Sequence, residues 1–115
     1  VWSGNDDETF ATMATGGHGI VSVAGHIVGT QIKTMMGLIL EGDIEAAAAE
    51  HRRLLPLFKA IFWVTNPIPI KYAVNRAGFD AGTYRLPMVS MEDADPGAKK
   101  RLDEMLDQYE MDLPV

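Results

Sequence analysis

The chain has 115 residues, of which 47% are hydrophobic and 23% charged, and its formal net charge is −6. This length and composition fit one ordinary globular domain, and an acidic balance without a clustered basic face argues against a nucleic-acid partner. The chain has no cysteine, which excludes a disulfide scaffold and a thiolate metal site, and it has no apolar run near the roughly 18 residues of a membrane span.

The first expected elements are two short strands with a helix between them. Residues 1–3 (VWS) have the character of a strand end, a helix is expected from Asn5 to about Gly16, and residues 19–23 (GIVSV) form a second, apolar strand. Apolar strands joined through a helix are typical of a parallel sheet that is buried on both faces. Two strands cannot make such a sheet, so we expect the chain to be the back end of a larger α/β protein whose other strands come from elsewhere.

The start of the first helix is strongly acidic. Asn5 is placed to cap this helix, and the three acids at residues 6–8 suit the positive end of its dipole. Consecutive residues at a helix start cannot converge on one point, so we do not expect these acids to form a catalytic pair or a magnesium site. Asn5 differs from them because it follows a strand directly, and parallel sheets and barrels hold their ligands at the carboxyl ends of strands.

Helical patterns dominate the rest of the chain. Apolar residues recur at helical spacing from Val28 to Ile39, a stop follows at Gly42, and Asp43 is placed to cap the next helix. A domain boundary is therefore expected near Gly42, with α/β material before it and an all-helical module at residues 43–115.

The helix after Asp43 carries an apolar stripe that predicts its buried face. The stripe comprises Ile44, Ala47, Ala48, His51, Leu55, Phe58 and Phe62. Because His51 lies on this stripe, we expect it to be a core residue rather than a ligand.

Further signals mark the starts of two later helices and the end of the chain. Asn66 is placed to cap a helix with Pro67 at its first position. A last helix is expected to begin at Asp95 and Pro96, and the chain from Asp112 onward is expected to fray.

Several segments, taken in order, are similar to motifs of one known family. They are SGND at residues 3–6, GHGIVSV at 17–23, LLPLF at 54–58, NPIPIK at 66–71 and RLP at 85–87. Together they resemble the dihydrodipicolinate synthase family of pyruvate-dependent class I aldolases, and the resemblance runs the whole length of the chain. It implies a (β/α)₈ TIM barrel, of which residues 1–42 supply strands seven and eight with their helices. Residues 43–115 would then form the all-helical C-terminal domain.

The resemblance also implies a chemistry. A buried barrel lysine, neutral because burial lowers its pKa, would form a Schiff base with pyruvate. The resulting enamine would attack aspartate semialdehyde in lysine (diaminopimelate) biosynthesis. In this family the lysine lies on the sixth strand, and none of this chain's own lysines matches its motif: Lys33, Lys59, Lys71, Lys99 and Lys100. We therefore expect no catalytic residue here, and a chain that is inactive alone.

The residues that carry over from the family are few. Val21 matches the position whose backbone carbonyl faces bound pyruvate, and Gly4 and Asn5 match the strand end that borders the substrate carboxylate. Asn5 stands where many relatives carry an acid, which leaves its contact open. Ser22 faces either the pocket or the helix layer, and the alternative for Val21 is a plain core valine.

The histidines suggest no metal centre, because no two of them have metal-ligand spacing. His18 is interpreted as a turn residue, and His26 lies just past a strand end, where a place at the pocket edge is one option. No cofactor and no metal are expected. The expected partners are the N-terminal remainder of the same barrel and three further copies in a cytoplasmic homotetramer.

Two alternatives remain at this point. The first is another pyruvate-dependent aldolase, such as an N-acetylneuraminate lyase or a 2-keto-3-deoxy sugar acid aldolase, although NPIPIK and RLP favour the synthase. The second is a non-catalytic helical oligomerisation module built from the helices after Gly42. The apolar strand at residues 19–23 argues against this second alternative, because it would be an exposed aggregation hazard.

Overall fold

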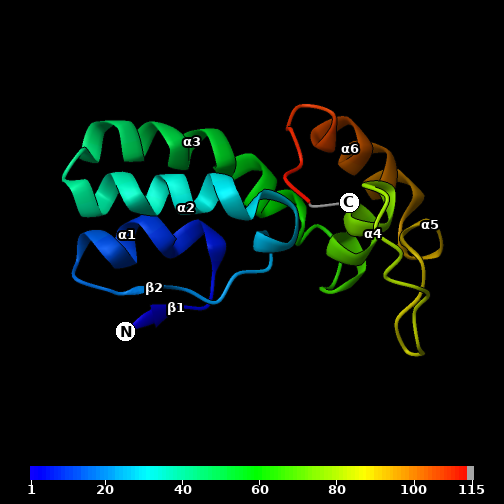
Figure 1. Cartoon of the computed structure of the whole chain (residues 1–115). Helices are drawn as coiled ribbons and strands as arrows, with labels where there is room; N and C mark the ends of the chain where they lie inside the picture. Colours follow the sequence, from blue (N-terminus) through cyan, green and yellow to red (C-terminus); the bar gives the residue numbers. More distant parts are fainter. Residues whose placement is uncertain (114–115) are drawn as a thin grey trace.

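The computed structural model describes residues 1–113, which form an elongated body of 44 × 26 × 25 Å. Figure 1 shows the strands and the helices of the first half of the chain at one end, and the later helices at the other. The elements in chain order are β1 (Trp2–Ser3), the 3₁₀ turn η1 (Asp6–Glu8), α1 (Thr9–Ala14), β2 (Gly19–Ile20), α2 (Gly25–Glu41), α3 (Ile44–Ala60), α4 (Ile68–Arg76), α5 (Met91–Ala94) and α6 (Pro96–Leu106).

The two strands form a parallel sheet, as the sequence predicts. Trp2 pairs with Gly19 and Ser3 with Ile20, and the connection between the strands runs through α1. The sheet has two strands within residues 1–113, so each strand has one free edge.

The predicted second strand is longer than the observed one. Regular pairing ends at Ile20 instead of Val23, although the Val21 N–H still donates to the Ser3 carbonyl at 2.9 Å. The Val21 side chain is 73% exposed in the described chain, so residues 1–113 alone do not bury this strand on both faces, and its burial by strands from elsewhere stays a prediction. Ile20, one residue earlier, is half-buried and packs against the apolar core.

Helices α2 and α3 form an antiparallel hairpin that lies over α1 (Figure 1). Gly42 ends α2 with a φ of 85°, a left-handed conformation that glycine adopts without strain. The Asp43 carboxylate then caps α3 by accepting the Ala46 N–H at 3.1 Å. The predicted stop and cap are both confirmed. The two-domain division near Gly42 stays a prediction, and α2 and α3, on either side of it, pack against each other.

The buried face of α3 matches its predicted apolar stripe only in part. Leu54 and Leu57, which the stripe omits, are fully buried. Phe58 is buried, at 2% exposure, whereas Ile44 and Phe62 are 46% and 48% exposed. Both lie at the ends of the stripe. Ile44 is the first residue of α3, and Phe62 follows its last, Ala60, where the chain turns away from the core.

One apolar core connects α2, α3, α4 and α6. Its buried side chains include Ile27, Val28, Ile32, Leu54, Leu57, Phe58, Ile61, Ile70, Val74, Met91, Leu102 and Leu106. Within residues 1–113, no helix has both the length and the apolar character needed to cross a bilayer.

The start of α4 corrects one prediction. The cap position is Pro67 rather than Asn66, and the helix begins at Ile68, because a further turn, closed by the Ile68 N–H on the Thr65 carbonyl, precedes it. The predicted start of α6 is confirmed, since Asp95 accepts the Ala98 N–H at 2.9 Å.

Candidate functional site

The candidate site lies at the carboxyl ends of the two parallel strands. The hydrogen bond from Val21 to the Ser3 carbonyl places Val21 directly beside the point where β1 ends. Gly4 and Asn5 are the next two residues of the chain. The structure thus brings Val21, Gly4 and Asn5 to one edge of the sheet, the edge at which parallel sheets bind ligands.

Val21 presents its backbone at this edge. Among residues 1–113 no hydrogen bond to the Val21 carbonyl is formed, and the residue is mostly exposed. A carbonyl without an intramolecular donor is free to accept a hydrogen bond from a ligand.

Gly4 and Asn5 are the other two candidate residues at this end of the sheet. A Cβ built at Gly4 would meet no atom within 4 Å, so the packing of the described chain does not require glycine there. Asn5 occupies the cap position of η1, but its side chain makes no cap hydrogen bond, which corrects the prediction. The Ser3 hydroxyl closes this turn instead, donating to the Asn5 carbonyl at 2.8 Å and accepting the Asn5 N–H at 3.1 Å.

Asp6 is the residue that sequence analysis missed. It is only 2% exposed, and its carboxylate accepts the N–H groups of Val23 and Ala24 at 3.1 and 3.0 Å. The Ser22 hydroxyl also donates to Asp6, so Ser22 faces this carboxylate. Asp6 therefore joins the end of β1 to the loop after β2 and fixes the loop that begins with Val21. No signal near residue 6 reveals this, because its partners lie 16 to 18 residues away.

A cavity of about 330 Å³ adjoins this edge. It is lined by Asn5, Asp6, Asp7, Glu8, Phe58, Lys59 and Phe62. One wall carries an ion pair, with the Lys59 Nζ atom 3.7 Å from an Asp7 carboxylate oxygen. The cavity therefore offers both charges to a ligand.

The lysines lie on helices rather than at the strand ends. Lys59 pairs with Asp7, Lys71 donates to the Thr83 carbonyl, and Lys99 lies 3.5 Å from Asp103. The charges of Tyr72 and then Asp103 raise the pKa of Lys99, which is opposite to what a Schiff-base lysine needs.

The histidines do not converge on the candidate site. His26 is exposed and lines a separate cavity of about 250 Å³ with residues of α4. His18 lies before β2, and its ring centroid is 5.3 Å from that of Trp2. Residues 1–113 contain no group of three side chains able to hold a metal ion.

His51 is half-buried and stacks on Phe10, with ring centroids 5.5 Å apart. Its Nδ1 atom is buried and has no hydrogen-bond partner within residues 1–113. Burial lowers the pKa of His51 below its usual 6.5, and Arg52 acts in the same direction, while Asp7 opposes both. The neutral ring is therefore the form that the fold favours.

This lowered pKa gives a testable pH dependence. Below pH 6.5 the unfolded chain binds the proton more readily than the folded chain, so the stabilisation is complete above pH 6.5 and is lost as the pH falls. We expect His51→Phe to reduce the loss of stability between pH 7.5 and pH 5.5, as measured by urea unfolding. His18→Gln, which removes an exposed histidine, is measured in parallel as the matched control. An unaltered pH dependence in His51→Phe would contradict the interpretation.

The fold and the site together define a class. Parallel strands that are joined through a helix and carry candidate residues at their carboxyl ends belong to the barrels and open sheets of α/β proteins.

Comparison with known proteins narrows this class. The sequence profile of the dihydrodipicolinate synthetase family matches residues 1–108. A 4-hydroxy-tetrahydrodipicolinate synthase from Dehalococcoides mccartyi (strain CBDB1) is 49% identical over 115 residues, covering 100% of this chain and 38% of the relative. One from Thermosynechococcus vestitus is 48% identical over 94 residues, covering 82% and 32%. The crystal structure of dihydrodipicolinate synthase from Aquifex aeolicus matches with a TM-score of 0.89 and 36% identity, covering 100% of this chain and 38% of that chain.

The chain belongs to the dihydrodipicolinate synthetase family. It spans about 38% of the length of the curated relatives that it matches most fully. Its fold matches part of the TIM-barrel synthases, which confirms the predicted α/β class. These matches support neither the sugar-acid aldolase alternative nor the non-catalytic helical module, since the family profile includes both strands.

Proposed function

We propose that this chain supplies strands seven and eight of a TIM barrel, with the C-terminal helical domain, to a lyase that condenses pyruvate with aspartate semialdehyde in lysine biosynthesis. Membership of the family is the observation that carries the proposal. The free edges of the two-stranded sheet support it, because a closed barrel pairs every strand on both sides. The remaining strands would come from the N-terminal part of the same barrel.

In this proposal Val21, Gly4 and Asn5 bind substrate. The free Val21 carbonyl accepts a hydrogen bond at the pyruvate site, and Gly4, which has open space where a side chain would lie, lets the substrate carboxylate approach the backbone. Asn5 borders the same carboxylate. The side chain of Val21 needs no polar group, since its main chain makes the contact.

The reactive lysine lies outside this chain. The amine that attacks pyruvate must be neutral, and an apolar, buried environment makes it so. Lys99 has a raised pKa, and Lys59 is paired with an acid, so neither has that environment. The proposed division of labour is that the partner segment performs the covalent chemistry, while this chain shapes the pocket.

Borohydride trapping with labelled pyruvate tests the proposal. The chain is combined with the segment that carries the other barrel strands, and the Schiff base is reduced and located by peptide mapping. We expect one label, on the partner segment, and none on Lys33, Lys59, Lys71, Lys99 or Lys100. Omission of pyruvate is the control and should leave both polypeptides unlabelled. A label on any of the five lysines, or no label at all, would contradict the proposal.

We extend the proposal to the assembly and its location. Large apolar side chains that are not part of the candidate site are exposed, with Leu40 at 79% and Leu86 at 86%, and exposed apolar surface of this kind supports oligomer formation. A homotetramer located in the cytoplasm is the proposed form.

A further inference from the structure

Helix α2 is interrupted near its start. Val28 has a φ of −134° and a ψ of 32°, which are not helical values, so a first turn from Gly25 is followed by a second, longer segment. The first N–H groups of any helical segment have no partner within it. The second segment of α2 therefore needs a cap of its own, and no preceding side chain of α2 supplies one.

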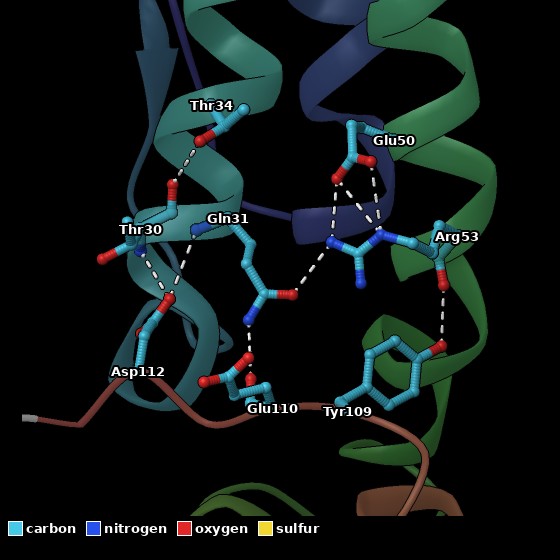
Figure 2. Close-up of polar contacts among 8 residues, drawn as sticks. All are labelled: Thr30, Gln31, Thr34, Glu50, Arg53, Tyr109, Glu110 and Asp112. Carbon is cyan, nitrogen blue, oxygen red and sulfur yellow. Dashed lines mark hydrogen bonds and ion pairs between the residues drawn. The ribbon is translucent and has the colours of Figure 1, made fainter.

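The cap comes from the far end of the chain. The Asp112 carboxylate accepts the N–H groups of Thr30 at 2.9 Å and of Gln31 at 3.2 Å, across 82 and 81 residues (Figure 2). The Asp112 N–H also donates to the Ile27 carbonyl at 3.0 Å. Asp112 thus binds the residue before the interruption at Val28 and the residues after it. The expectation that the chain frays from Asp112 onward is therefore wrong for Asp112 itself. Pro114 and Val115 lie outside the described residues.

The segment that carries Asp112 is attached to both helices of the hairpin (Figure 2). The Gln31 Nε2 atom donates to the Glu110 carbonyl at 2.7 Å, and the Tyr109 hydroxyl donates to the Arg53 carbonyl at 2.7 Å. The Arg53 guanidinium in turn donates to the Gln31 side chain at 2.9 Å. Asp112 is therefore held in place independently of its own contacts with α2.

The same turn leads back to the candidate site. The N–H groups of Ile27 and Val28 both donate to the Ala24 carbonyl at 2.9 Å, and the Ala24 N–H donates to Asp6. Only residues 22–24 separate this turn from the Val21 carbonyl at the carboxyl end of the sheet. Asp6 binds the loop itself through the N–H groups of Val23 and Ala24. Asp112 binds the helical turn that follows this loop in the chain.

We propose that Asp112 is a positioning residue for pyruvate binding. It caps the second segment of α2 and thereby holds the Val21–Ala24 loop so that the Val21 carbonyl faces the substrate. This inference rests on the proposed function, in which that carbonyl contacts pyruvate, and it adds a role for the C-terminal segment, which touches no substrate.

The test compares cap variants in the enzyme assembled with the remaining barrel strands. Removal of a helix cap acts on the loop and not on the reacting atoms, so we expect Asp112→Ala to raise the KM for pyruvate by about fivefold and to change kcat little. Amide hydrogen exchange at residues 21–25 should become faster by a similar factor. Asp112→Asn keeps an acceptor oxygen and should have the wild-type KM for pyruvate. Asp112→Ser, whose side chain is shorter, should have a KM between those of the wild type and the alanine variant. The serine variant replaces the alanine variant in the test if the latter does not fold.

Asp43→Ala is the matched control, because Asp43 caps the neighbouring helix α3 and does not contact the loop after β2. It should lower stability and leave KM and the exchange at residues 21–25 unchanged. Equal KM values in Asp112→Ala and Asp43→Ala, in an active wild-type assembly, would overturn the positioning role alone. A wild-type assembly that forms no adduct with pyruvate would overturn the proposed function, and the positioning role with it.

Discussion

Replacement of Asp6 by alanine is expected to lower the free energy of unfolding of this chain by about 3 kcal/mol. The carboxylate is buried and accepts three hydrogen bonds, from the Ser22 hydroxyl and from the N–H groups of Val23 and Ala24. Its loss leaves these donors without partners, and a buried donor without a partner costs about 1–3 kcal/mol. Urea unfolding followed by circular dichroism measures the change.

The adjacent acid provides the control for this experiment. Asp7 makes an ion pair with Lys59 at 3.7 Å, with side chains that are 39% and 62% exposed, and such pairs contribute about 0–1 kcal/mol. We expect Asp7→Ala to change stability by no more than that. If the two alanine variants are equally stable, the Asp6 carboxylate does not hold the loop after β2.

Replacement of Phe58 by alanine is expected to have the largest effect on stability, about 3–5 kcal/mol. Phe58 is 2% exposed and belongs to the core that connects α2, α3, α4 and α6. Its removal loses buried apolar surface and leaves a cavity that a packed interior fills only in part. Thermal and urea unfolding both measure the loss.

Phe62 is the matched control, since it is the same residue type four positions further along the chain but is 48% exposed. We expect Phe62→Ala to change stability by less than about 1 kcal/mol. Similar losses of stability in both variants would mean that the burial of Phe58 does not decide the effect, contrary to the observed packing.

The parts of the fold that the sequence predicts well depend on local chemistry. Gly42 ends α2, Asp43 begins α3 and Asp95 begins α6, because a glycine stop and a carboxylate cap act within a few residues of their own position. The parallel arrangement of the strands is also predictable, since an intervening helix allows no tight hairpin.

The parts that it predicts poorly depend on distant residues. The predicted stripe on α3 correctly marks Phe58 but omits the fully buried Leu54 and Leu57. It also extends to residues that are exposed, because periodicity does not tell where neighbouring elements pack. Asp6 and Asp112 look like ordinary surface acids in the sequence, and their roles come from partners 16 to 18 and 81 to 82 residues away. Neither residue has a local signal that could reveal this.

The candidate site also combines features that the sequence predicts with features that it does not. Position after a strand suffices to select Asn5, and the parallel pairing then brings Gly4 and Val21 beside it. The substrate-binding role of Val21 comes from the family resemblance alone, because a backbone carbonyl leaves no trace in the identity of its side chain. That role stays a prediction until the pocket is tested.

The long-range cap on α2 has a consequence for biosynthesis. The ribosome must add 82 residues after Thr30 before it delivers Asp112, which takes roughly 4–16 s at 5–20 residues per second. During this delay the second segment of α2 emerges without its cap. A nascent chain that terminates before Asp112 therefore lacks this cap. Such a truncated chain differs from the longer one at Thr30 and Gln31, far from the position of truncation.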